Sequence, residues 1–228
     1  MPMSRLVVER VAPALGSLLD QLVLVGGCAA AFLVPQPEDR TLRPTEDVDY
    51  IVPAFSYGEF AEWETRLRQL GFTECPDEGV ICRWMVNGIR VDFMPVEGRI
   101  LGFTNRWYAE AVRDPELFAL KSGLQVRVVN VPVFLATKFE AFGDRGGGDY
   151  AVDSDIEDVI TVLAFRPESA DLIAAAAPEV REYLCEQVIQ LLGRADVQDI
   201  IGGCFDANHQ ALVPNVLRVL QHIERLRW

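Results

Sequence analysis

Two aspartates separated by one residue, in the segment Asp47-Val48-Asp49, are the most chemically suggestive feature of this sequence. The apolar run that follows predicts a strand, and positions i and i+2 of a strand point to the same face, so the two carboxylates converge. Like charges this close are unfavourable unless a cation or a proton lies between them. Hard divalent ions such as Mg²⁺ take oxygen ligands of this kind, with substrate phosphates completing the shell. The alternative interpretation is a solvated acidic start to a strand.

A third aspartate, Asp92, lies inside an otherwise apolar run. Aspartate is depleted in strand interiors and is rarely buried unless it is paired. Asp92 is therefore either a further metal ligand on a neighbouring strand or the partner of a nearby arginine.

A glycine pair, Gly26-Gly27, separates a short apolar run at 22–25 from a small-residue helix beginning near Cys28. Glycines at such a junction let the backbone approach a phosphate, and a helix N-terminus offers free N–H donors to it. A tight strand-to-helix turn without a ligand explains the pair equally well.

A fourth group of charged residues lies further along the chain, at Lys138, Arg145, Asp155 and Asp158. Asp155 and Asp158 are three residues apart and share one face of a helix. A lysine oriented by such a carboxylate could bind a triphosphate. The structural alternatives are helix N-capping by Asp155 and an ammonium of Lys138 that extends to water.

The elements that would position these residues fall into two parts, 1–130 and 131–228. The first part alternates helical segments at 4–20, 28–33 and 59–70 with strand-like runs at 22–25, 48–52, 80–86, 89–96 and 125–129. Asn87-Gly88 between two apolar runs is a strong hairpin signal, because both residues tolerate positive φ. The second part is helical throughout, with segments at 133–142, 155–165, 170–177, 180–192 and 213–226. We therefore expect an α+β fold with a mixed sheet flanked by helices, followed by a helical C-terminal part that contributes Lys138 and Asp155 to the site.

Composition excludes several classes of protein. The 228 residues carry a formal charge of −13, which opposes broad binding to nucleic-acid backbones. The five cysteines form no CxxC pair, so neither a zinc site of the usual spacing nor a disulfide framework is supported. Free thiols fit a reducing cytosol, and no apolar stretch is long enough to span a bilayer. We expect a cytoplasmic protein with no membrane partner.

In their order along the chain, these pieces resemble the nucleotidyltransferase superfamily built on a DNA-polymerase-β-like core. The resemblance rests on Gly26-Gly27, Asp47-Val48-Asp49 and Asp92. The later Lys138…Arg145…Asp155-x-x-Asp158 stretch is similar to the corresponding block of the AbiEii and MenT-like branch, whose members serve as toxins of toxin–antitoxin systems. One departure is Cys28, which stands where the superfamily usually has serine or threonine.

The resemblance implies a Mg²⁺-dependent nucleotidyltransferase that moves an NMP group from an NTP to an acceptor hydroxyl. Asp47, Asp49 and Asp92 would bind two Mg²⁺ ions, and Asp92 would also help to deprotonate the acceptor. Gly26, Gly27 and Cys28 would cradle the phosphates, and Lys138 would reach the triphosphate. Asp155 or Asp158 would hold Lys138 or Arg145 in place.

The acceptor is left open by the sequence. In the toxin branch it is often an RNA end such as the tRNA 3′ terminus, and a cognate antitoxin is then an expected partner. A local basic face would be needed for RNA, from the arginines at 83, 90, 99, 106 and 113. The alternatives are a small-molecule acceptor of the aminoglycoside type, with Glu97 and Glu110 or Asp114 lining an acidic pocket, and a non-catalytic nucleotide-binding or interaction protein of the same fold.

Overall fold

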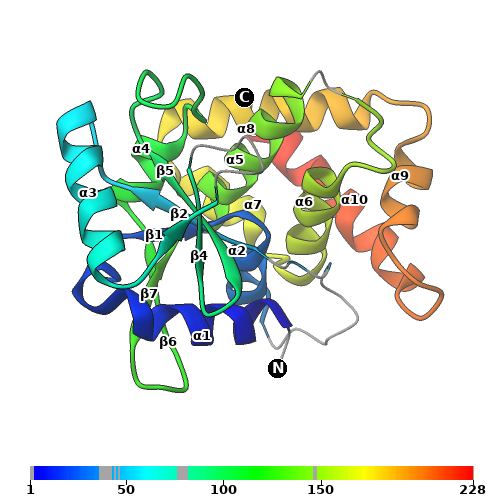
Figure 1. Ribbon diagram of the computed structural model, residues 1–228. Helices are drawn as coiled ribbons and strands as arrows, with labels where there is room; N and C mark the ends of the chain where they lie inside the picture. Colours follow the sequence, from blue (N-terminus) through cyan, green and yellow to red (C-terminus); the bar gives the residue numbers. More distant parts are fainter. Residues whose placement is uncertain are drawn as a thin grey trace. The chain divides into compact units, whose positions relative to one another are not determined.

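The computed structural model describes residues 3–35, 43, 45, 47–75, 82–145 and 148–227. The chain divides into two compact units, and Figure 1 labels their helices and strands. The first comprises Met1–Phe32 and Pro44–Asn130, and the second comprises Leu33–Arg43 and Val131–Trp228.

The first unit is built on a seven-stranded mixed sheet in the order β3-β4-β5-β2-β1-β7-β6. The strands are β1 (Val23–Val25), β2 (Asp47–Val52), β3 (Thr73–Glu74), β4 (Arg83–Val86), β5 (Ile89–Pro95), β6 (Glu116–Ala119) and β7 (Gln125–Val128). Strand β2 runs parallel to β5, and β1 runs parallel to β7, whereas the other neighbours are antiparallel. The α+β class with a mixed sheet is thus confirmed.

Helices precede and interrupt these strands. They are α1 (Met3–Leu15), a 3₁₀ turn at Gly16–Leu18, α2 (Gly26–Leu33), α3 (Tyr57–Gln69) and α4 (Tyr108–Arg113). Gly16 ends α1 with φ +53, so the predicted helix over 4–20 is shorter than expected. In α3 the Ser56 hydroxyl caps the first turn by accepting from the Glu59 N–H at 3.3 Å.

Tyr50 of β2 and Phe93 of β5 are both fully buried, and their rings stack with the centroids 6.0 Å apart.

The hairpin between β4 and β5 forms at the predicted turn. Asn87 has φ 51 and Gly88 has φ 73, the combination that a type I′ turn requires. The two-residue turn fixes the register, pairing Val86 with Ile89 and Arg83 with Asp92. The predicted first strand of the hairpin begins at Val80, but residues 80 and 81 lie outside the described residues.

The second unit is helical over the residues that the structure describes. Its helices are α5 (Val131–Asp144), α6 (Ser154–Phe165), α7 (Ser169–Ala175), α8 (Pro178–Leu192), α9 (Val197–Gly203), a 3₁₀ turn at Gln210–Leu212 and α10 (Val213–Arg225). The predicted helices at 133–142, 155–165, 170–177, 180–192 and 213–226 all form, each within two residues of the expected bounds. Helix α10 packs on α6, α7 and α8 and buries Val216, Leu220 and Ile223.

None of the helices in the described residues is long and apolar enough to cross a membrane.

Candidate functional site

Asp49 and Asp92 lie directly opposite one another on the parallel strands β2 and β5. Neighbouring strands are about 4.8 Å apart, and residues in register on parallel strands share a face of the sheet. Asp47 lies two residues earlier on β2 and therefore on that same face, about 6.6 Å along the strand. The structure thus places the three predicted aspartates on one face of two adjacent strands.

Gly26 lies beneath the Asp49 carboxylate. It is the first residue of α2, immediately after β1, and Val25 at the end of β1 pairs with Asp49. A Cβ atom on residue 26 would lie 1.8 Å from the Asp49 Oδ2, and the φ of +64 is one that side chains rarely adopt. The start of α2 therefore approaches the carboxylate closely because residue 26 is glycine, and Gly27 follows as the second residue of the helix.

The Cys28 side chain is turned toward the main chain of α1 and β2. The residue is fully buried. Its Sγ lies 3.3 Å from the Asp47 carbonyl oxygen and 3.6 Å from that of Ser4, where the thiol can donate to either. A phosphate-binding role for Cys28 therefore depends on its backbone N–H, because its side chain serves to hold α2 against the neighbouring backbone.

Asp92 forms a two-point ion pair with Arg83, its cross-strand neighbour on β4. Its Oδ1 accepts from Arg83 Nε at 2.9 Å and its Oδ2 accepts from Nη2 at 2.8 Å. Both side chains are largely buried, with exposed fractions of 16% for Arg83 and 10% for Asp92. The arginine pairing that the sequence left open as an alternative for Asp92 is present in the structure.

Asp92 is buried, whereas Asp47 and Asp49 are partly exposed. Cys82, which directly precedes β4, is also buried, and its pKa is raised to about 12. Burial is the largest cause, followed by the negative charge of Asp92 and then that of Asp49. The thiol therefore remains neutral at physiological pH. Burial likewise strengthens the interaction of the Asp92 carboxylate with a cation.

The donor set fits Mg²⁺ in its chemistry. Over the described ranges, no three histidine, cysteine, aspartate or glutamate side chains gather closely enough to hold a metal ion. Mg²⁺, however, is usually held by one or two carboxylates together with substrate phosphates and water. Asp47 and Asp49 supply two carboxylates on one face, next to the close backbone approach at Gly26. Asp92 can become a further metal ligand only if its oxygens bind the metal alongside Arg83 or give up their hydrogen bonds to Arg83.

A second cluster, in the second unit, centres on Lys138 of α5. Its Nζ donates to Asp155 Oδ1 at 2.9 Å and to Asp158 Oδ2 at 2.5 Å, both on the face of α6 that their spacing predicted. Burial alone would lower the pKa of Lys138, but Asp158 and Asp155 outweigh it and hold that pKa above its usual value. Burial likewise raises the pKa of Asp155, but Lys138 and Arg145 outweigh it and bring that pKa below its usual value. Lys138 is thus a fixed cation, oriented by two carboxylates.

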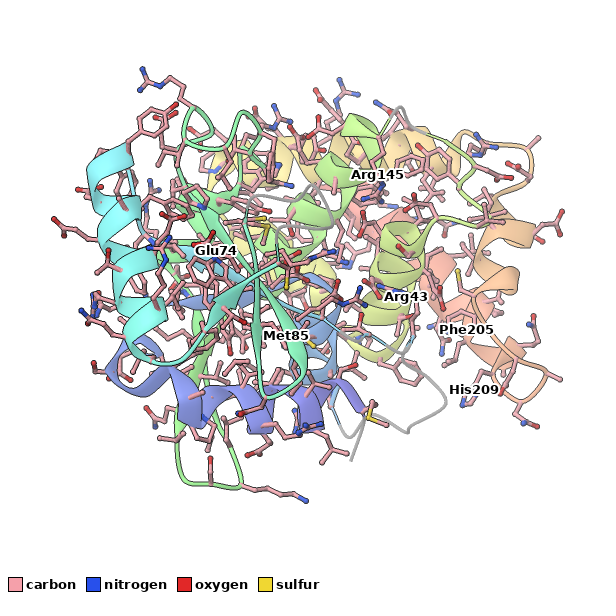
Figure 2. All side chains as sticks on the ribbon, in the orientation of Figure 1. Arg43, Glu74, Met85, Arg145, Phe205 and His209 are labelled. Carbon is pink, nitrogen blue, oxygen red and sulfur yellow. The ribbon has the colours of Figure 1, made fainter. Side chains whose placement is uncertain are left out.

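Arg145, labelled in Figure 2, follows the end of α5 and donates to Asp155 and, at 3.2 Å, to Asp153. Asp153 is the N-cap of α6, because its Oδ1 accepts from the N–H groups of Asp155 at 2.8 Å and Ile156 at 3.4 Å. The capping role considered for Asp155 therefore belongs to Asp153, and Asp155 is left to hold Lys138 and Arg145.

Arg43, also labelled in Figure 2, is a member of the second cluster that the sequence did not predict. Its Nη2 lies 3.8 Å from Asp158 Oδ2. Its Nε is buried and has no hydrogen-bond partner within the described part of the chain. This contact could not be predicted from the sequence, because 115 positions separate the two residues and no motif links them.

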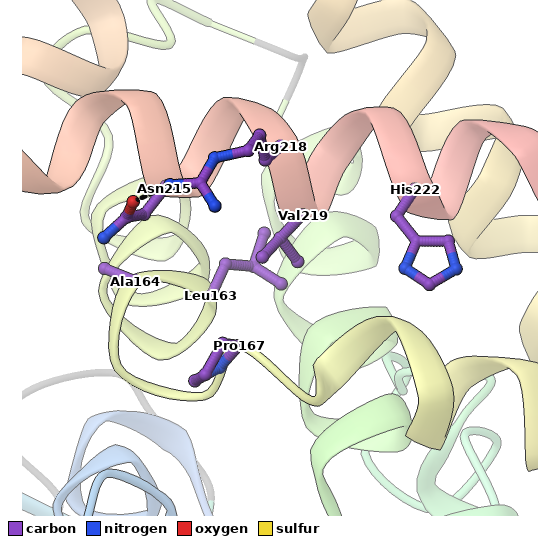
Figure 3. A pocket seen from close by; sticks show the side chains of 7 residues that line it. All are labelled: Leu163, Ala164, Pro167, Asn215, Arg218, Val219 and His222. Atoms are coloured by element: carbon purple, nitrogen blue, oxygen red, sulfur yellow. Dashed lines mark hydrogen bonds between the residues drawn. The ribbon is translucent and has the colours of Figure 1, made fainter.

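A cavity of about 330 Å³ lies elsewhere in the second unit, between α6 and α10 (Figure 3). Its lining residues are Leu163, Ala164, Pro167, Asn215, Arg218, Val219 and His222. None of these belongs to the predicted site.

In comparisons with known proteins, neither a family model nor a curated protein matched this chain. The functional interpretation therefore rests on the geometry of the two clusters and on the sequence resemblance.

Proposed function

We propose that this chain is a Mg²⁺-dependent nucleotidyltransferase that moves an NMP group from an NTP to an acceptor hydroxyl. The observation that supports this most strongly is the register of Asp49 with Asp92, with Asp47 on the same face and Gly26 beneath the Asp49 carboxylate. Three carboxylates on one face of two strands are costly unless cations accompany them.

In this proposal Asp47 and Asp49 hold two Mg²⁺ ions together with the triphosphate. The ions, when bound, would stabilise the attacking and leaving oxygens of an in-line displacement. The backbone at Gly26 and Gly27 supplies N–H donors to the phosphates at the start of α2. Asp92, in register with Asp49, is the carboxylate that would accept the proton of the acceptor hydroxyl. The contact of Lys138 with the triphosphate remains a prediction from the resemblance.

An RNA acceptor, such as a tRNA 3′ end modified by a toxin with a cognate antitoxin, is the first proposal for the substrate. The arginines considered for it have other contacts. Arg99 pairs with Glu97, Arg113 pairs with Glu110, and Arg106 lies over the Trp107 ring. The same pairs neutralise Glu97 and Glu110, which were considered for a polycationic small-molecule acceptor. Neither acceptor is favoured by these residues, so the chemistry of transfer is the better supported part of the proposal.

A second candidate function has one specific observation in its favour. Both oxygens of Asp92 already accept hydrogen bonds from Arg83, as would suit a protein that binds nucleotide or a partner without turnover.

The test is to incubate the purified chain with each α-³²P-labelled NTP, Mg²⁺ and total tRNA. Label should pass to RNA with the unmodified protein and with Asp171→Ala, a change at an exposed residue of α7, but not with Asp49→Ala. Mg²⁺-dependent NTP binding without transfer to RNA would instead support a small-molecule acceptor or the non-catalytic alternative. Absence of NTP binding would overturn the proposal.

A further inference from the structure

A row of three charged side chains crosses the sheet at the candidate site. Asp49 on β2, Asp92 on β5 and Arg83 on β4 are successive cross-strand partners. Charges of the same sign directly opposite one another destabilise a sheet, whereas opposite charges stabilise it. Asp92 therefore has one unfavourable neighbour and one favourable neighbour, and both of its oxygens accept hydrogen bonds from the favourable one.

The next row also places an arginine opposite an aspartate. Asp47 on β2 has Arg90 on β5 as its partner in register. Counted over both rows, three aspartates face two arginines, which leaves one net negative charge. A divalent ion arriving alone would reverse the sign of this patch, whereas an ion that arrives with a triphosphate brings negative charges with it.

We propose that Arg83 is a positioning residue that compensates Asp92 until metal and nucleotide arrive together, and so makes metal binding depend on the nucleotide. This inference rests on the proposed function, because it assumes that the aspartates bind the ions of an NTP. Metal bound at Asp92 must share an oxygen with Arg83 or take its place, since the Nε and Nη2 of Arg83 each occupy one oxygen.

Burial distinguishes this pair from an ordinary surface ion pair. Arg194 and Asp196 have the same two-point geometry, at 2.9 and 2.8 Å, but their side chains are 37% and 49% exposed. Solvent screens that pair, and its loss would cost little. Loss of Arg83 would instead leave Asp92 buried without a counter-charge, which a metal ion could then supply.

The experiment measures Mn²⁺ binding by electron paramagnetic resonance on the full chain, with and without an α,β-methylene NTP analogue. Without nucleotide, we expect Arg83→Gln to bind Mn²⁺ about tenfold more tightly than the unmodified protein, because a nearby positive charge has been removed. Arg83→Lys, which keeps the charge, and Arg194→Gln, the exposed counterpart, should both stay close to the unmodified value. With the analogue present, the difference in Mn²⁺ affinity between Arg83→Gln and the unmodified protein should become smaller.

Equal Mn²⁺ affinities of Arg83→Gln and the unmodified protein without nucleotide would overturn the role of Arg83 and leave the proposed function standing. Absence of Mn²⁺ binding by every variant, even with the analogue, would overturn both. A second measurement needs no variant. The Nε–H resonance of Arg83 in the unmodified protein should shift when Mg²⁺ and the analogue are added together but not when Mg²⁺ is added alone, and an unchanged resonance would contradict the proposal.

Discussion

At the scale of single residues, Gly26 and Asp49 show how closely the site is packed. The Asp49 carboxylate occupies the space that a side chain at position 26 would need. The closeness of helix α2 to the aspartates therefore depends on one absent methyl group.

A left-handed backbone conformation costs alanine about 1–2 kcal/mol. We expect Gly26→Ala to destabilise the protein by more than this, because the added Cβ must also displace the Asp49 carboxylate. Urea unfolding measures the change. The control is Gly123→Ala, since Gly123 also has positive φ, +85, but an added Cβ would meet nothing within 4 Å. Equal losses in the two variants would show that the contact with Asp49 has no energetic weight.

Lys138→Met should cost about 3–5 kcal/mol near neutral pH, because it removes the buried cation that Asp155 and Asp158 share. The remaining contacts, Arg145 with Asp155 and Arg43 with Asp158, compensate the two carboxylates only in part. In the unmodified protein the pKa of Asp155 is lowered, so its stabilising contribution is present above the unfolded pKa and is lost as pH falls through the folded one. The pKa of Lys138 is raised, so its contribution is complete below its unfolded pKa and is lost as pH rises through the folded one.

The loss of unfolding free energy in Lys138→Met, relative to the unmodified protein, should therefore become smaller as pH is lowered from neutral toward the pKa values of the carboxylates. Protonation there removes the charge that the missing lysine no longer compensates. Thermal unfolding across that range checks this. A deficit that stays constant with pH would mean that the lysine contributes through packing alone.

The sequence predicted this level of the structure unevenly. The shared face of Asp47 and Asp49 follows from strand alternation, and that of Asp155 and Asp158 follows from helical spacing. The pairing of Arg83 with Asp92 could be predicted, because counting residues outward from the Asn87-Gly88 turn brings the two opposite one another. The contact of Arg43 with Asp158 could not be predicted, since it depends on tertiary packing.

At the scale of elements, the long periodic helices lie where the sequence predicted them, whereas several short elements were not predicted. Strands β3 and β6 and helix α4 have two to six residues, too few for a hydrophobic period to show. The register of β2 with β5 was also unpredictable, because 36 residues lie between them and no turn fixes their pairing.

The turn at Asn87-Gly88 offers a test at this scale. Gly88→Val should destabilise the protein by about 1–2 kcal/mol or more, because a β-branched residue is strained at φ 73. Asn87→Gly should be nearly neutral, since glycine accepts φ 51 readily. Guanidinium unfolding of the two variants decides this, and a tolerated valine would contradict the turn geometry.

At the scale of the whole molecule, the formal charge of −13 dominates the electrostatics. Self-repulsion of that size opposes the compact state, and salt reduces it, because the screening length falls from about 30 Å at about 0.01 M to about 8 Å at about 0.15 M. The buried Lys138 pairs are screened much less than the surface charges.

We therefore expect the thermal midpoint to rise as NaCl is increased over this range, with EDTA present to exclude divalent ions. KCl at equal ionic strength should give the same rise, because screening does not distinguish the two cations. A midpoint that falls with salt would show that favourable surface pairs outweigh the net repulsion.

The turn between β4 and β5 has a kinetic consequence as well. A hairpin closed by two residues can form within about 1–10 μs, whereas pairing of β2 with β5 must wait for a much longer loop to close. Arg83 can therefore meet Asp92 early in folding, before Asp49 approaches from the distant strand. We therefore expect one carboxylate to be neutralised locally before the second is brought beside it, so that the repulsion between the two arises in the later steps of folding.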